Sequence, residues 1–136
     1  FNTYGPRMRK KDGRAIPNFI NQCLTNKDIT VFGDGLQTRS FCYIDDTIEG
    51  IYKLLNSNYQ LPVNIGNPVE YSIQELIEKI KSIIPCSSKI VYRKFPENDP
   101  KIRQPDINLA KVKLNWHPKI NLMDGLIKTV DYYNNS

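Results

Sequence analysis

The sequence holds few residues that could bind a metal ion. It contains one histidine, His117, and three cysteines, Cys23, Cys42 and Cys86, which lie far apart and form no CxxC pair. Zinc sites usually combine several such ligands at short spacings, so the sequence predicts no metal site. Cys23 and Cys42 fall on apolar faces, and we expect them to be core thiols in a reducing compartment.

Long apolar segments are missing as well. No apolar run approaches the length that crosses a membrane, and no signal-peptide pattern opens the chain. The first residues, Phe1-Asn-Thr-Tyr-Gly-Pro6, are typical of a strand that ends in a turn. We therefore expect a cytoplasmic protein with no membrane segment in these residues, and a chain that is part of something longer.

Residue pairs for nucleophilic or acid–base catalysis are not apparent. No serine or threonine has a histidine near it in the sequence, and we expect a structural role for His117 in Trp-His-Pro. Asp46 and Glu49 have the spacing of a helix N-cap and its acidic third position, so we interpret Asp45 and Asp46 as capping residues. Gly33-Asp-Gly35 does not match the glycine fingerprint of dinucleotide sites. The sequence therefore indicates binding groups and no reactive centre.

The composition is that of one globular domain. The 136 residues are 40% hydrophobic and 24% charged, which suffices for a single core. A net charge of +5, from 19 basic and 14 acidic residues, suits an anionic ligand or nucleic acid. Only Arg7-Met-Arg-Lys-Lys11 clusters basic residues, and no nucleic-acid motif accompanies it. We interpret this cluster as a solvated loop and expect no nucleic-acid partner.

Apolar periodicity and turn residues predict an α/β domain of short strands and about five helices. Pro17 suits the first turn of a helix, and Ser72 with Glu75 forms a capping box before a helix that Pro85 ends. The expected strands cover residues 30–32, 39–44, 62–66 and 89–94. The expected helices run over 17–24, 46–55, 73–84 and 106–114, and from 122 onwards.

The stretch from Thr30 to Asp46 is the centre of this arrangement. Arg39 follows the flexible turn Gly33-Asp-Gly35, and a guanidinium beside such a turn can seat a phosphate with paired donors. An exposed surface arginine is the simpler alternative. Other polar side chains occur in loops or at element ends, where ligand contacts concentrate: Asn2, Arg14, Asn18, Asn64 and Arg103.

Several motifs together resemble a known family. They are Phe1-Asn-Thr-Tyr-Gly-Pro-Arg-Met8, Asp12-Gly-Arg14, Pro17-Asn-Phe-Ile-Asn-Gln22, Thr30-Val-Phe-Gly-Asp-Gly-Leu-Gln-Thr-Arg-Ser-Phe-Cys-Tyr-Ile-Asp-Asp46, Pro62-Val-Asn-Ile-Gly-Asn-Pro68 and Asp99-Pro-Lys-Ile-Arg-Gln-Pro-Asp106. In this order they closely resemble the UDP-glucuronate decarboxylases, the UDP-xylose synthase branch of the extended short-chain dehydrogenases. Leu114-Asn-Trp-His-Pro118 is similar to a further family motif, with Asn115 in place of the usual glycine.

The resemblance is to the C-terminal half of that family. It implies that residues 1–6 end a strand and turn of a Rossmann domain, and that residues 7–136 form the substrate-binding portion. The Rossmann domain itself, with its glycine fingerprint and a catalytic Tyr-x-x-x-Lys pair, is missing from this sequence. The resemblance therefore implies no catalytic residue here, NAD bound mainly by the missing domain, and a homodimer. The family also allows the Golgi lumen if an anchor precedes these residues.

The resemblance further implies roles for individual residues in converting UDP-glucuronate to UDP-xylose and CO2 through a 4-keto intermediate. Arg39 would lie near the diphosphate, Arg103 near the ribose and phosphate, and Asn2 near the diphosphate or sugar. Thr3 and Arg14 would touch the cofactor side. The remaining substrate-binding residues are Asn18 and Asn64, and Val31, Phe32 and Gly33 along the uracil.

Three other functions stay open at this point. A dTDP-glucose 4,6-dehydratase would usually carry Asn-Asn-Tyr-Gly-Pro and a Glu-Lys before the helix, whereas this chain has Asn2-Thr-Tyr-Gly-Pro6 and Asp12-Gly-Arg14. A UDP-sugar 4-epimerase is the second possibility. The third is a non-catalytic module that binds a nucleotide sugar or uses its basic loop for a partner.

Overall fold

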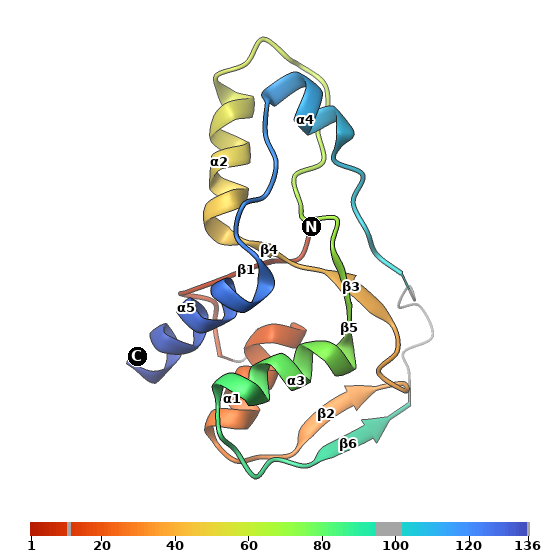
Figure 1. Cartoon of the computed structure of the whole chain (residues 1–136), viewed down its shortest axis with the longest axis vertical. Coiled ribbons are helices and arrows are strands. Elements are labelled where there is room, and N and C mark those ends of the chain that lie inside the picture. Colours follow the sequence, from red (N-terminus) through yellow and green to blue (C-terminus); the bar gives the residue numbers. More distant parts are fainter. Residues whose placement is uncertain (11, 95–101, 136) are drawn as a thin grey trace.

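The computed structural model describes residues 1–10, 12–94 and 102–135. This part of the chain forms five helices and six short strands, which confirms the predicted α/β class (Figure 1). The helices are α1 (Ala15–Leu24), α2 (Ile44–Leu55), α3 (Ile73–Ile83), α4 (Asn108–Leu114) and α5 (Leu122–Asn134).

The strands pair two by two. β1 (Thr3–Tyr4) lies parallel to β4 (Cys42–Tyr43), and β2 (Ile29–Phe32) lies parallel to β6 (Ile90–Arg93). β3 (Thr38–Ser40) is antiparallel to β5 (Glu70–Ser72), with Arg39 opposite Tyr71. The first residues of the chain are thereby held beside the strand that follows Arg39.

Two apolar cores support these elements. The larger core is built on α1, α3, α5 and β2, and its fully buried members include Ile20, Ile29, Leu76 and Leu126. The smaller core, which we call the Trp116 core, consists of Cys42, Ile107, Ala110, Leu114 and Trp116. Figure 1 shows α2 and α4 together at one end of the molecule and α1, α3, β2 and β6 at the other.

Helix α3, which packs in the larger core, starts as the sequence predicts. Ser72 caps it by accepting a hydrogen bond from the Glu75 backbone N–H, and the Glu75 carboxylate accepts one from the Ser72 N–H. This reciprocal pairing satisfies two donors that a helix start leaves open. Because Ser72 also ends β5, the cap fixes α3 relative to β3 and hence to Arg39.

The predicted cap at Asp46 is wrong. α2 begins at Ile44 with Tyr43 as its N-cap, so Asp46 lies inside the first turn. Asp46 is only 3% exposed, and its carboxylate accepts hydrogen bonds from the backbone N–H groups of Lys119 (3.0 Å) and Ile120 (2.9 Å). The side chain therefore joins α2 to the segment that enters α5, a role that local spacing cannot reveal.

Two predicted strands also differ from the structure. The strand expected over residues 39–44 is divided into β3 and β4 at Phe41. Residues 62–66 form no strand, and the one backbone link recorded there is a 3.0 Å hydrogen bond from the amino group of Phe1 to the Ile65 carbonyl. A strand needs a neighbour to pair with, and among the described residues this is the single backbone–backbone hydrogen bond to the segment.

Candidate functional site

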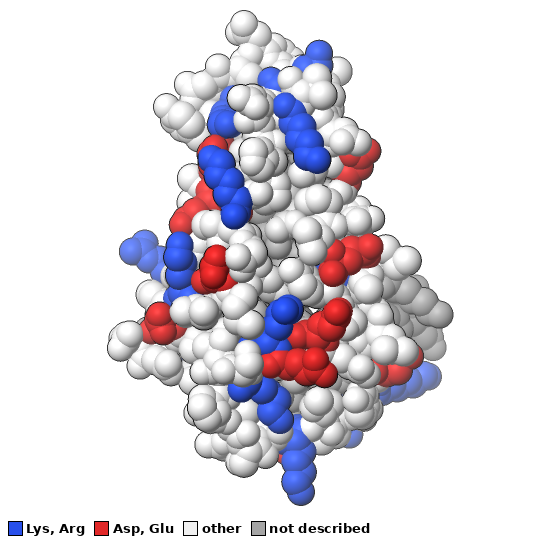
Figure 2. Space-filling model, viewed as in Figure 1, with Lys and Arg blue, Asp and Glu red and all other residues white. Residues whose placement is uncertain are grey.

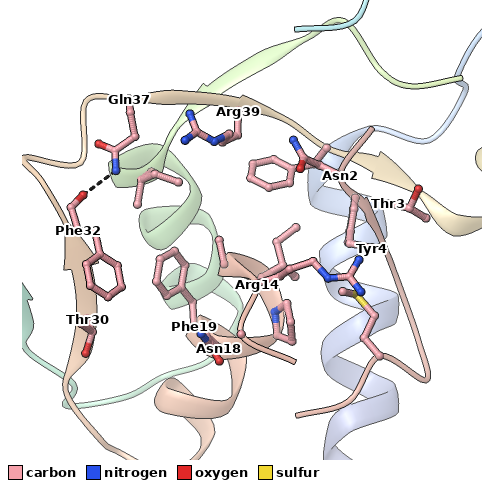
Figure 3. Close-up of a pocket in the computed structure, with 17 residues that line it drawn as sticks. Asn2, Thr3, Tyr4, Arg14, Asn18, Phe19, Thr30, Phe32, Gln37 and Arg39 are labelled. Carbon is pink, nitrogen blue, oxygen red and sulfur yellow. Dashed lines mark hydrogen bonds between the residues drawn. The ribbon is translucent and has the colours of Figure 1, made fainter. Parts of the chain in front are cut away.

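A pocket of about 290 Å³ lies between the start of the chain, α1, β2 and β3. Six of the residues predicted to bind ligand line it: Asn2, Thr3, Arg14, Asn18, Phe32 and Arg39. Figure 3 shows Arg39 and Gln37 along one rim and Asn18 with Phe19 on the opposite side. Segments far apart in the sequence thus bring amide, guanidinium and aromatic groups around one cavity.

Arg39 is the most buried charged side chain of this pocket. It is 8% exposed, sits on the β3 strand that pairs with β5, and donates a 2.7 Å hydrogen bond to the Thr38 carbonyl. A guanidinium keeps its charge at any physiological pH and carries five donors in a planar fork. Because the side chain is buried, the direction of its donors is fixed. Such an arrangement favours the specific binding of an anionic ligand.

Gln37 is a pocket residue that the sequence analysis did not select. Its side-chain amide donates a 2.6 Å hydrogen bond to the Phe32 carbonyl, and its buried side-chain oxygen has no hydrogen-bond partner (Figure 3). A buried acceptor without a donor is costly, so it points to a donor supplied by a ligand or water. Two-residue spacing puts Gln37 and Arg39 on the same side of an extended segment, a signal that could have identified it.

The edge of the pocket nearest the chain start is held by hydrogen bonds. Asn2 adopts a left-handed backbone with φ of 44° and donates from its side chain to the Ser40 carbonyl at 2.9 Å. Thr3 follows it, and its hydroxyl lies 3.2 Å from that of Thr47 in α2. These contacts tie the first residues to β3 and α2, so both side chains are fixed at the pocket margin.

Arg14 is placed differently. It occupies the N-cap position of α1, and its side chain remains 61% exposed while pairing with Asp12. One guanidinium nitrogen donates to the Asp12 carboxylate at 2.9 Å. The hydrogen bond from Arg14 lowers the pKa of Asp12, and the same hydrogen bond raises the pKa of Arg14. Such an exposed pair is weak and easily exchanged for a ligand anion.

The other predicted residues lie outside the pocket lining. Val31 is buried in the larger core, so its side chain faces away from any ligand. Gly33 donates its backbone N–H to the Arg93 carbonyl, and Asn64 donates to the Asp106 carbonyl near α4. Arg103 is exposed, and its carbonyl accepts a hydrogen bond from the Ser40 hydroxyl at 3.2 Å. That bond anchors the backbone of Arg103 next to the strand that bears Arg39.

The groups that line the pocket are suited to binding a ligand. Its lining offers guanidinium, amide, hydroxyl and aromatic groups, and its volume is near the lower end of small-ligand cavities. Within the described ranges, no group of three or more histidine, cysteine or acidic side chains is arranged to hold a metal ion. None of the described helices combines the length and apolar character needed to cross a bilayer. The arrangement suits a bound anion with an aromatic or amide-bearing portion.

Known proteins match this chain closely. The NAD dependent epimerase/dehydratase family model matches residues 1–66. UDP-glucuronic acid decarboxylase 1 of Danio rerio is 45% identical over 133 residues, which cover 98% of this chain. The chain belongs to the NAD-dependent epimerase/dehydratase family. UDP-glucuronic acid decarboxylase 3 of Arabidopsis thaliana is another relative, 47% identical over 93% of the chain.

Solved structures of this family share the fold over nearly the whole chain. UDP-glucuronic acid 4-epimerase from Bacillus cereus, in complex with UDP-glucuronic acid and NAD, is 36% identical with a TM-score of 0.91. The match covers 99% of this chain and 43% of that one. UDP-glucose 4-epimerase from Thermotoga maritima, with UDP-glucose, is 28% identical with a TM-score of 0.94, over 98% and 44% of the two chains. NAD is the cofactor of the family.

The chain corresponds to only part of the length of these proteins. It spans about a third of the length of the curated relatives, 32% of the Danio rerio protein and 37% of the Arabidopsis thaliana protein. The family resemblance drawn from the sequence motifs is therefore confirmed. What the family's full-length members do is a matter for proposal in this chain.

Proposed function

We propose that this chain is the nucleotide-sugar-binding part of an NAD-dependent UDP-glucuronate decarboxylase, which converts UDP-glucuronate to UDP-xylose and CO2. The observation that carries the proposal is 44–47% identity to UDP-glucuronic acid decarboxylases over 93–99% of the chain. The pocket adds support because its buried arginine suits a diphosphate. A dehydratase is a weaker choice, since the dTDP-glucose 4,6-dehydratase from Bacillus anthracis is 25% identical.

In this proposal the pocket binds the UDP end of the substrate. Arg39 donates to the diphosphate, and Asn2 and Asn18 contact the diphosphate or sugar from opposite sides of the cavity (Figure 3). Phe32, whose side chain is 50% exposed, lies along the uracil together with the Val31 and Gly33 backbone. Arg103 reaches the ribose and phosphate from the loop that Ser40 anchors, and Asn64 completes the predicted set.

NAD, when bound, would supply the reversible hydride chemistry at C4 of the sugar that the decarboxylation needs. Only the margin of a cofactor site is present in these residues: Thr3, held by Thr47, and the exposed Arg14. Both line the pocket, so they fit contacts to the cofactor side of the substrate. The glycine fingerprint and the Tyr-x-x-x-Lys pair would come from a Rossmann domain.

An exposed apolar face on α2 fits the docking of that domain. Ile48, Ile51, Tyr52 and Leu55 recur at helical spacing on one side of the helix and are 49–78% exposed. A contiguous apolar patch of this kind usually marks an interface. We assign residues 1–6 to the edge of the Rossmann domain and 7–136 to the substrate-binding portion. In the proposed full-length enzyme, homodimer contacts fall mainly in the Rossmann domain and the enzyme is cytoplasmic.

Turnover by the protein that contains this chain tests the function. Purified protein with NAD and UDP-glucuronate is followed by CO2 release and by chromatography of nucleotide sugars. We expect CO2 and UDP-xylose in equal amounts. UDP-galacturonate without CO2 would favour the 4-epimerase. Tight UDP binding with no turnover would favour a non-catalytic module.

Arginine substitutions test the site itself. A charge-assisted bond to phosphate contributes roughly 1.5–3 kcal/mol, and about 1.4 kcal/mol is a factor of ten in affinity. Arg39→Ala or Arg103→Ala should therefore weaken UDP binding about ten- to a hundred-fold, and lysine should recover only part. Titration calorimetry with UDP and with NAD is the measurement, and NAD affinity should barely change. Arg9→Ala, an exposed loop arginine outside the pocket lining, is the control. If both alanine variants bind UDP with the affinity of the parent, the proposal that the diphosphate binds at these arginines is wrong.

A further inference from the structure

Two cysteines that are 63 positions apart meet at the end of α1. Cys23 lies in the last turn of α1 within the larger core, and Cys86 packs against the same core from the segment after α3. The two thiols lie close enough for each to shift the pKa of the other. Neither forms a disulfide in this structure. The spacing in the sequence gave no hint of this pair, because the contact depends on how α1 and α3 pack.

Hydrogen bonds fasten the two segments around the thiol pair. The Asn26 side-chain oxygen accepts from the Ser87 N–H at 3.0 Å and from its hydroxyl at 3.2 Å. One turn earlier, the Gln22 carbonyl accepts from the Ser88 hydroxyl at 3.3 Å. Lys81 also donates to the Ser88 carbonyl at 3.0 Å. These contacts lie on both sides of Cys23 and directly follow Cys86, so they hold the sulfurs in register.

The two thiols are unequal in access and in acidity. Cys23 is 1% exposed, and burial together with the hydrogen bond to Cys86 raises its pKa to about 12. Cys86 is partly exposed. Burial acts against its ionisation, but hydrogen bonds from Cys23 and Ser88 and the charge of Lys81 outweigh that effect and lower the pKa of Cys86. An accessible, stabilised thiolate beside a second, buried thiol is the arrangement of an attacking and a resolving cysteine.

We propose that Cys86 and Cys23 form a peroxide-sensitive thiol pair, in which Cys86 is oxidised first and Cys23 resolves it to an intramolecular disulfide. The packing of both cysteines on the same core and the docking of residues 87–88 on the end of α1 carry the proposal. It is independent of the decarboxylase function. Because α1 and β2 both line the pocket, the disulfide would also stiffen the junction below it.

The chemistry balances with hydrogen peroxide as the oxidant. The Cys86 thiolate attacks one peroxide oxygen, the O–O bond breaks, and Cys86 becomes a sulfenic acid as hydroxide leaves. The Cys23 sulfur then attacks the sulfenyl sulfur, the S–O bond breaks, and water leaves with the Cys23 proton. Two thiols lose two electrons in total, and one peroxide molecule is reduced to water. A dithiol reductant reverses the reaction by exchange.

Peptide mapping of the whole protein tests the pair. Trypsin separates the cysteines, because cleavage after lysine and arginine gives residues 15–27 with Cys23, 40–53 with Cys42 and 82–89 with Cys86. After titration with peroxide and blocking of remaining thiols, we expect peptides 15–27 and 82–89 joined at a mass about 2 Da below their sum. Dithiothreitol should separate them. In the reduced protein, Cys86 should react with iodoacetamide at least about tenfold faster than the buried Cys42.

Single substitutions separate the two roles. In Cys23→Ser, the Cys86 sulfenic acid should persist and be trapped by dimedone, whereas in Cys86→Ser the buried Cys23 should stay reduced. Cys42→Ser is the matched control, since Cys42 lies in the Trp116 core, and it should leave the cross-link intact. Unchanged Trp116 fluorescence verifies that the fold is retained. Oxidation of Cys42 as fast as Cys86, or overoxidation of Cys86 without a link to Cys23, would overturn the proposal.

Discussion

Replacing Asp46 offers the sharpest test of how the structure is held together. Its carboxylate lies in the first turn of α2 and accepts backbone hydrogen bonds from Lys119 and Ile120, more than 70 positions later. Its own carbonyl accepts from the Trp116 indole at 3.0 Å. Asp46 therefore connects α2, the Trp116 core and the entry to α5. We expect Asp46→Ala to lower the free energy of unfolding markedly.

The magnitude follows from the two lost bonds. A hydrogen bond to a charged acceptor contributes roughly 1.5–3 kcal/mol, so the pair contributes about 3–6 kcal/mol. Lys119 and Ile120 are not fully buried, and water can partly replace the carboxylate, so we expect a loss of about 3 kcal/mol. A typical domain has only about 5–15 kcal/mol of stability. The variant should therefore lose a large share of its stability.

Asp45 provides a matched control. It is exposed and lies in the same first turn of α2, so Asp45→Asn and Asp46→Asn each remove one negative charge from the helix start. The effect on the helix dipole is then similar in both. Asn at position 46 keeps one acceptor oxygen but presents an N–H₂ group to the second backbone N–H. We expect a loss of about 2 kcal/mol there and less than about 0.5 kcal/mol at position 45.

Urea titration of the chain at low concentration measures these differences. Trp116 is the sole tryptophan, is 1% exposed and is bonded to Asp46, so its fluorescence reports on this part of the fold directly. The midpoint should fall in the order parent and Asp45→Asn, then Asp46→Asn, then Asp46→Ala. Equal midpoints for the two asparagine variants would refute the reasoning, because only the dipole term would then matter.

Four further predictions concern the chain as a whole. The isolated chain should release no CO2 from UDP-glucuronate and NAD, because it lacks the glycine fingerprint and the Tyr-x-x-x-Lys pair; turnover at an ordinary enzymatic rate would contradict this. It should also be of marginal stability and associate through the apolar face of α2, and light scattering should fall when the Rossmann domain is supplied or when Ile51 and Leu55 become glutamine; a monomeric, cooperatively melting chain that gains nothing from the Rossmann domain would argue against an interface there. Gly125→Ala should cost about 1–3 kcal/mol in urea unfolding, since a Cβ there would lie 2.8 Å from ring carbons of both Tyr4 and Tyr43. Hydrogen bonds from Ser72 lower the pKa of Glu75 in the folded state, so its stabilisation is present above the unfolded pKa of about 4.3 and is lost as the pH falls through the folded value; Glu75→Gln should flatten the acid limb of a stability–pH curve, and an unchanged limb would exclude this contribution.

Local patterns predicted the parts of the structure that local contacts determine. The capping box at Ser72 and Glu75 forms as expected, because both of its hydrogen bonds span three residues. The strand before the glycine turn and the position of Arg39 after it also follow from neighbouring residues. The family resemblance rests on motifs of the same kind, which are short and continuous.

Features that depend on distant partners could not be predicted in this way. The acceptor role of Asp46 needs Lys119 and Ile120, and the thiol pair needs α1 and α3 to meet. The pocket draws together Asn2, Asn18 and Arg39, but periodicity gives no information on which loops converge. The two-residue spacing from Arg39 could have indicated Gln37, but its unsatisfied buried oxygen is visible only in three dimensions.

Charged side chains of both signs are mixed on the surface. Figure 2 shows lysine and arginine side chains interspersed with aspartate and glutamate on the face toward the viewer. Lys119 and Lys53, for example, both approach Glu49, at 2.8 Å and 3.4 Å. The excess of basic residues is thus partly neutralised locally, and among the described lysines and arginines Arg39 is the buried one.

The two cores are interleaved along the chain. The larger core and its neighbours come from residues 4–44, 71–86 and 120–133, whereas the Trp116 core and its neighbours come from 42–65 and 107–116. During synthesis, neither core can therefore be completed before part of the other has been made. The larger core is complete only when α5 has been synthesised. Closing such long loops is slow compared with forming a helix. A single cut in the chain cannot separate the two cores. We therefore expect them to fold as one unit.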